Sequence, residues 1–226
     1  MLPALNHYKT TVLDSLWGRQ TLTIRDRSLI TVAVAIARNH SALLPEEMAR
    51  ALDNGISAAE LSEVITHLAF YCGWGNAQQA SNAALTLFSA REIDATQLPN
   101  GRVTLLDIDE QSEQARVVAV ESAVGSQQFP DLVNDTTQVL FHSLWLRPDL
   151  APRDRSLVTF SALVANGQSA QIGFHLNKAM DNGFTASEAA AALGQLAFYA
   201  GWPNAMSAVA VVKQVVAARA AMTTID

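Results

Sequence analysis

A repeated sequence constrains this chain more than any other feature. Four segments of the first half recur in the second half at a constant separation of 128 positions, with no insertion or deletion between the first and the last of them. A repeat of this length is one supersecondary unit copied in tandem, so the sequence predicts two similar folding units. The pairs are Ser15–Arg19 with Ser143–Arg147, Arg25–Leu29 with Arg153–Leu157, Asp53–Gly55 with Asp181–Gly183, and Leu68–Ala77 with Leu196–Ala205.

Each copy has the residue pattern of helices. Alanine is frequent, and runs of β-branched residues that alternate with polar ones are scarce, so we expect an all-α fold. Ser57 with Glu60, and Thr185 with Glu188, match the capping box that begins a helix. The expected helices of the first copy are 3–17, 25–39, 45–54, 57–72 and 76–91. Those of the second copy are 110–124, which opens it, 130–145, a helix after Pro152, one that ends at Gly183, 185–199 and 204–221.

These elements divide the chain into a first helical repeat at 1–94, a connector at 95–106 and a second repeat at 107–226. Pro99-Asn100-Gly101 is a turn signal inside the connector, and a short extended segment is expected at 102–105.

The composition argues against several classes of protein. Half of the residues are hydrophobic, which is enough for a substantial core. The net charge is −6 and the pI about 5.3, which argues against a nucleic-acid partner. No apolar run is long enough to span a membrane, and the first residues do not resemble a secretory signal, so we expect a soluble cytoplasmic protein. With one cysteine, Cys72, neither an intrachain disulfide nor a cysteine-rich zinc site can form, and we predict no metal site.

The most informative positions are those where the copies differ. Glu63 and His67 lie four residues apart on one face of a predicted helix, whereas the second copy has Ala191 and Gln195 there. Conversely, His175 of the second copy replaces Glu47 of the first. Glu63, His67 and His175 therefore form a candidate acid–base set only when both halves contribute. A carboxylate beside His67 is expected to raise the pKa of the imidazole and to fix its tautomer.

Other candidates have two interpretations. Glu60 is either a capping residue or a further catalytic carboxylate. Arg27 and Arg155 either make buried ion pairs or hold a substrate carboxylate by a two-pronged hydrogen bond. Tyr71 is either a packing residue or a substrate contact. Cys72 is either a small core residue or a redox thiol, although a helix C-terminus does not favour a thiolate.

These motifs together resemble the carboxymuconolactone decarboxylase family over about 15–88 and 143–216. The resemblance lies in Arg-Asp-Arg-Ser-Leu, in a His-Leu-x-x-Ala-x-x-Asn-Gly segment, and in Glu-x-x-x-Val-x-x-x-Leu-Ala-Phe-Tyr-x-Gly-Trp-x-Asn-Ala. It implies a tandem form of the helical repeat shared with alkyl hydroperoxidase D. Since family members assemble as trimers or hexamers of single-repeat chains, it also implies a homotrimer that mimics the hexamer.

The resemblance implies two chemistries. One branch of the family decarboxylates gamma-carboxymuconolactone, an intermediate of aromatic catabolism, without a cofactor, and His67, Glu63 and His175 are similar to its residues. The other branch is peroxidatic and uses a Cys-x-x-Cys pair with a Glu and a His. Glu60 and Cys72 match two of those positions, but Gly75 and Gln79 occupy the other two.

From the resemblance we expect a cofactor-independent lyase for a small carboxylated lactone or related enolisable acid. In this hypothesis His67 moves the proton, Glu63 orients it, and His175 is a second acid. The alternatives are a peroxiredoxin-like antioxidant role through Cys72 and a helical scaffold that binds a small ligand without catalysis.

Overall fold

The computed structural model describes residues 1–223, in which the regular secondary structure is helical and there is no β-strand. This confirms the all-α fold. The first repeat comprises α1 (Pro3–Tyr8), α2 (Asp14–Leu16), α3 (Ile24–Ala37), α4 (Leu44–Asp53), α5 (Ala58–Cys72) and α6 (Trp74–Ala90). After α7 (Glu110–Ala123), the second repeat comprises α8 (Pro130–Asp135), α9 (Pro152–Ala165), α10 (Ser169–Asp181), α11 (Ala186–Tyr199) and α12 (Trp202–Thr223).

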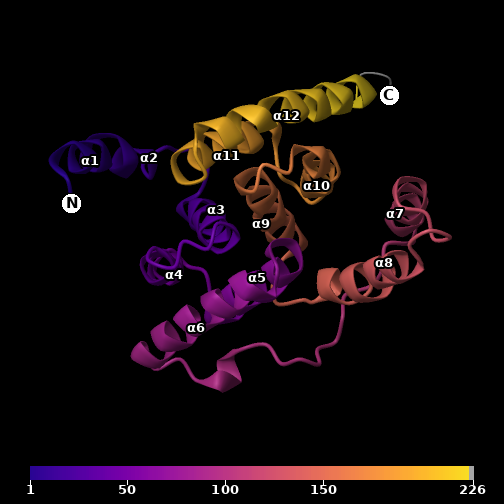
Figure 1. The fold of residues 1–226 in the computed structure, drawn as a ribbon, viewed down its shortest axis with the longest axis horizontal. Coiled ribbons are helices and arrows are strands. Elements are labelled where there is room, and N and C mark those ends of the chain that lie inside the picture. The colour runs from indigo at the N-terminus through magenta and orange to yellow at the C-terminus, as the bar shows by residue number, and fades with distance from the viewer. Residues whose placement is uncertain (224–226) are drawn as a thin grey trace.

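The two repeats pack around a pair of central helices. α3 and α9 contact each other, with α4 against α3 and α10 against α9 (Figure 1). α5 of the first repeat packs on α9, and α11 of the second repeat packs on α3, so the repeats exchange contacts reciprocally. One continuous hydrophobic core runs through both halves. Side chains from different repeats therefore meet wherever α5 faces α9 or α11 faces α3.

Local sequence signals account for the helix boundaries. Both predicted capping boxes are present: Ser57 and Thr185 accept from the backbone N–H of Glu60 and Glu188, whose carboxylates accept from the N–H groups of the capping residues. Gly73 has a φ of 85°, which a side chain would oppose, and it separates α5 from α6. Gly201 has a φ of 95° and separates α11 from α12 in the same way.

Three predicted elements differ in detail. The predicted helix at 3–17 contains a π-helical segment at Lys9–Leu13, and the one at 130–145 ends with a π-helical segment at Thr136–Phe141. Leu144–Leu146 is a separate 3-10 turn. The expected extended segment at 102–105 forms no strand within 1–223, although Leu106 N donates to Leu146 O (2.8 Å) just after it.

No helix within residues 1–223 is long and apolar enough to cross a membrane.

Candidate functional site

The reciprocal packing creates two related clusters of side chains, which we call site one and site two. In each, a helix of one repeat faces an Arg-Thr pair on the central helix of the other repeat. Corresponding residues of the two sites are separated by 128 positions in the sequence. Site one comprises Glu63, His67, Tyr71, Trp145, Arg147, Arg155, Thr159 and His175. Site two comprises Ala191, Gln195, Tyr199, Trp17, Arg19, Arg27, Thr31 and Glu47.

His67 is completely buried in site one, and both of its ring nitrogens have partners. Thr159 donates its hydroxyl to the Arg155 carbonyl (2.8 Å), so its oxygen accepts from Nε2–H of His67 (2.7 Å). Nδ1 of His67 then accepts from Nη1 of Arg155 (3.3 Å). The imidazole is therefore the neutral Nε2–H tautomer.

Gln195 makes the same contacts in site two. Its Oε1 accepts from Nη1 of Arg27 (2.8 Å), and its Nε2 donates to Thr31 Oγ1 (3.1 Å). An amide that accepts from Arg and donates to Thr has the hydrogen-bonding pattern of the neutral His67 tautomer. The His67 position is thus a structural link between α5 and α9, as Gln195 is between α11 and α3.

The expected pairing of Glu63 with His67 is wrong. The Glu63 carboxylate accepts from Arg147 Nη2 (2.6 Å) and Nε (2.9 and 3.0 Å), and from Arg155 Nη2 (3.2 Å). Arg155 thus lies between Glu63 and His67. Burial, followed by the Arg155 charge, holds the pKa of His67 well below its ordinary value, so the expected rise is also wrong.

His175 joins this cluster through ring contacts. Its ring stacks on Trp145 (centroids 5.8 Å apart, planes at 14°) and meets Tyr71 edge-on at 5.3 Å. The buried Nδ1 of His175 has no hydrogen-bond partner among the described residues. Burial and the Lys178 charge lower the pKa of His175 to about 4. The structure therefore brings the three predicted residues Glu63, His67 and His175 into one cluster, and only His175 has an unused proton-accepting atom.

Tyr71 and Arg155 have structural partners here. The Tyr71 hydroxyl accepts from Nε1 of Trp145 (2.9 Å), and burial raises the pKa of Tyr71. Nη1 of Arg155 binds His67, while Nη2 binds Glu63 and the Arg147 carbonyl. Arg155 is thus committed within the protein, in line with the buried ion-pair interpretation. The guanidinium of Arg27 has fewer hydrogen-bond partners than that of Arg155.

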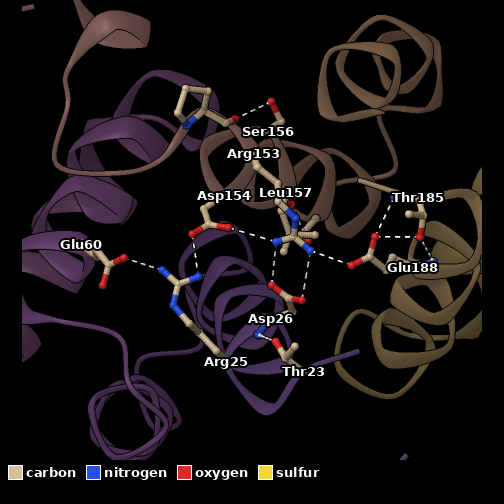
Figure 2. A network of polar contacts seen from close by, with 12 residues as sticks. Thr23, Arg25, Asp26, Glu60, Arg153, Asp154, Ser156, Leu157, Thr185 and Glu188 are labelled. Carbon is tan, nitrogen blue, oxygen red and sulfur yellow. Dashed lines mark hydrogen bonds and ion pairs between the residues drawn. The ribbon is translucent and has the colours of Figure 1, made fainter. Parts of the chain in front are cut away.

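Glu60 lies outside site one, in a network that joins the repeats (Figure 2). It accepts from Ser57 N in the capping box and from Arg25, and Arg25 also donates to Asp154 (2.6 Å). The Arg153 guanidinium bridges Asp26 (2.8 and 3.1 Å) and Glu188 (2.9 Å) on the other side. These contacts give Glu60 a structural role, and Glu188 has the equivalent one.

Cys72 packs against the core at the end of α5. Burial raises the pKa of its thiol to about 12, so the reactive thiolate is scarce at neutral pH. Among the described residues no group of three or more His, Cys, Asp or Glu side chains is arranged to hold a metal ion.

A cavity of about 560 Å³ lies beside site one, between α7 and α10. Trp145 and Phe174, which both contact the His175 ring, form part of its wall. Arg116 and Lys178 bring two positive charges to the lining, and the Nη1 of Arg116 is buried without a partner. Acidic side chains also line the cavity: Asp107, Asp109, Glu113 and Asp181.

Sequence reasoning missed the two cations of this cavity. Arg116 lies on α7, which has no counterpart in the first repeat, so the comparison of copies gave no signal for it. Lys178 corresponds to Arg50, and both place a positive charge over the equivalent tryptophan: Lys178 over Trp145 at 5.2 Å and Arg50 over Trp17 at 4.7 Å. The positive charge shared by Arg50 and Lys178 is a signal in the sequence from which Lys178 could have been identified.

The chain belongs to the carboxymuconolactone decarboxylase family, whose profile matches it twice, at residues 3–86 and 130–214. Among characterised proteins, it is similar to 4-carboxymuconolactone decarboxylase of Acinetobacter baylyi, at 31% identity over 85 residues, which is 38% of this chain and 63% of that protein. It is also similar to nitrosuccinic acid decarboxylase npaB of Metarhizium robertsii, at 29% identity over 80 residues, which is 35% of this chain and 56% of that protein. Each match spans less than two thirds of the relative's length.

Proposed function

We propose that this protein is a decarboxylase-like lyase that needs no cofactor and acts on a small carboxylated lactone or related enolisable acid. The observation that carries the proposal is His175, whose buried Nδ1 has no hydrogen-bond partner within residues 1–223 and whose ring contacts Trp145 and Phe174, two residues that line a cavity with two cations. Both relatives are named for removal of a carboxyl group from a small acid, which supports the same reaction class.

The substrate carboxylate would be held by Arg116 and Lys178. The free Nη1 of Arg116 offers N–H donors, and its guanidinium is fixed by Glu113 through Nε (2.7 Å) and Nη2 (2.5 Å). Burial lowers the pKa of Lys178, the carboxylates of Asp181, Asp109 and Glu113 oppose this effect, and the Arg116 charge adds to it. An anion held between Lys178 and Arg116 would interact with both cations.

Proton delivery then falls to His175. An anionic substrate in the cavity raises the pKa of the nearby imidazole, which takes up a proton on binding. Loss of CO2 leaves the carbon–carbon bonding pair on the substrate, where the lactone carbonyl delocalises it. That carbon takes the proton from the imidazolium, and His175 returns to its neutral form. His67 acts as a positioning residue, because its nitrogens are already bonded to Arg155 and Thr159.

The test is release of ¹³CO2 from carboxyl-labelled 4-carboxymuconolactone and nitrosuccinic acid. His175→Gln should lower kcat by about 10²-fold or more, the usual contribution of a general acid. The matched control is His40→Gln, which changes a half-buried histidine outside both sites. Equal turnover by the two variants, or no turnover of any carboxylated lactone or enolisable acid by the wild type, would remove the assignment.

We also propose a homotrimer. Large apolar side chains remain exposed at equivalent places of the two repeats, with Trp74 72% and Trp202 54% exposed. Exposed apolar patches of this kind are typical of contact surfaces between subunits.

A further inference from the structure

We propose that site two binds the carboxylate of a small organic acid, held by Arg27 and Arg19 in the space that corresponds to the Glu63 carboxylate of site one. This inference does not rest on the lyase activity, because it concerns binding at the opposite contact between the repeats. Site one supplies the comparison, since it contains the same two arginines with a carboxylate already attached.

In site one, a single carboxylate forms hydrogen bonds with two arginines. Glu63 is 1% exposed and bonds to both Arg147 and Arg155. The corresponding residue of site two is Ala191, whose methyl group offers no acceptor. The arginines themselves are kept as Arg19 and Arg27. Site two therefore has the two cations of site one without the carboxylate that binds them there.

Without a carboxylate at position 191, Arg27 has a hydrogen-bond donor that its counterpart Arg155 uses. Nη2 of Arg155 makes two hydrogen bonds, to Glu63 and to the Arg147 carbonyl. Nη2 of Arg27 keeps only the equivalent of the second, to the Arg19 carbonyl (2.7 Å). Within residues 1–223 the Nε atoms of both Arg27 and Arg155 are buried without partners, so the difference between the sites lies at Nη2. One N–H of the buried Arg27 thus points to the position that a carboxylate takes in site one.

Arg19 is placed to share the same anion. Its Nη1 lies 4.0 Å from where a Cβ on Gly194 would be, one helical turn from Ala191 on α11. Within 1–223, its side chain has no hydrogen-bond or ion-pair partner. Burial, followed by the Arg19 charge, lowers the pKa of Arg27, which reflects two cations close together. Asp26, whose charge raises the pKa of Arg27, is engaged by Arg153 through both carboxylate oxygens.

The site is also reachable. Ala191 is half-buried, whereas Glu63 is buried, and Arg19 is exposed. A guanidinium fork binds a carboxylate by two parallel N–H···O bonds, and a second cation nearby strengthens them. The group that occupies the equivalent place in site one is a carboxylate, which favours an organic acid over a spherical anion as the ligand.

Calorimetric titration of the whole protein with succinate tests the proposal. We expect saturable binding in the wild type, and loss of at least about tenfold in affinity in Ala191→Glu, because the new side chain takes the ligand's place. Ala191→Glu should also raise Tm in buffer, as bound succinate does in the wild type. Succinamide, which has the same shape without the charge, should not bind.

The opposite substitution provides a matched control. Glu63→Ala removes the carboxylate from site one and leaves Arg147 and Arg155 without it. If the variant has the helical content of the wild type, it should bind two succinate molecules per chain, whereas the wild type binds one. Arg19→Ala should weaken the original site about tenfold, while Arg19→Lys should weaken it less. Wild-type affinity in Ala191→Glu, displacement of succinate by equimolar chloride, or equal affinity for inorganic phosphate would overturn the proposal.

Discussion

The equivalence of His67 and Gln195 makes a quantitative prediction for His67→Gln. Since Gln195 accepts from Arg27 and donates to Thr31 as His67 does with Arg155 and Thr159, the variant should keep both hydrogen bonds. At pH 7.5 its free energy of unfolding should lie within about 1 kcal/mol of the wild type. His67→Leu leaves the buried, charged Arg155 Nη1 without a partner and removes one of the two hydrogen bonds of Thr159, which should together cost about 2–5 kcal/mol.

His67→Gln should also change the pH dependence of the free energy of unfolding. The folded pKa of His67 lies well below its ordinary value of 6.5, so below pH 6.5 the unfolded chain binds a proton that the folded chain does not. The wild type therefore loses stability as the pH falls below 6.5, by at most about 1.4 kcal/mol per pH unit from His67 alone. His67→Gln removes this contribution and should be the more stable protein at pH 5.

Urea denaturation of wild type, His67→Gln and His67→Leu between pH 7.5 and pH 5 measures both effects. His175 adds a second loss in the wild type, because its folded pKa of about 4 also lies below the unfolded value, and this loss remains in His67→Gln. The reasoning is refuted if His67→Gln is as unstable as His67→Leu at pH 7.5, or if its pH dependence equals that of the wild type.

Three further predictions concern other parts of the molecule. Because an anion beside His175 raises its pKa from about 4, binding of an unreactive substrate analogue at pH 6 should take up close to one proton, measured by calorimetry in buffers of different ionisation enthalpy, and His175→Gln should show none. With the pKa of its thiol near 12, Cys72 should react with a thiol probe at pH 7 far more slowly than free cysteine, and Cys72→Ser should retain turnover; rapid labelling would restore the redox alternative. Light scattering should give three times the 24.3 kDa chain mass, and Trp74→Glu with Trp202→Glu should lower it; a monomeric wild type would contradict the trimer.

The fold was predictable because its signals are local. A constant offset of 128 positions, two capping boxes and the Gly73 and Gly201 breaks each depend on a few neighbouring residues, and the structure has all of them. The π-helical segments were missed because hydrophobic spacing does not distinguish one wider turn from the α-helix around it.

The sequence indicated which residues lie together in site one, but not which of them contact each other. Comparing the copies identified Glu63, His67 and His175, and the structure brings them together. The contacts among them were not predictable, because helix spacing shows which residues share a face and not which side chain of another helix enters between them. Arg155 of α9 enters between Glu63 and His67, and burial, followed by the Arg155 charge, lowers the His67 pKa instead of raising it.

The central claim is that site one carries the chemistry and that His175, not His67, moves the proton. The most direct test is the rate of ¹³CO2 release by His67→Gln and His175→Gln with one proven substrate. The account predicts that His67→Gln stays within about tenfold of the wild type, while His175→Gln loses about 10²-fold or more. The reverse order, with His67→Gln inactive and His175→Gln active, would contradict it.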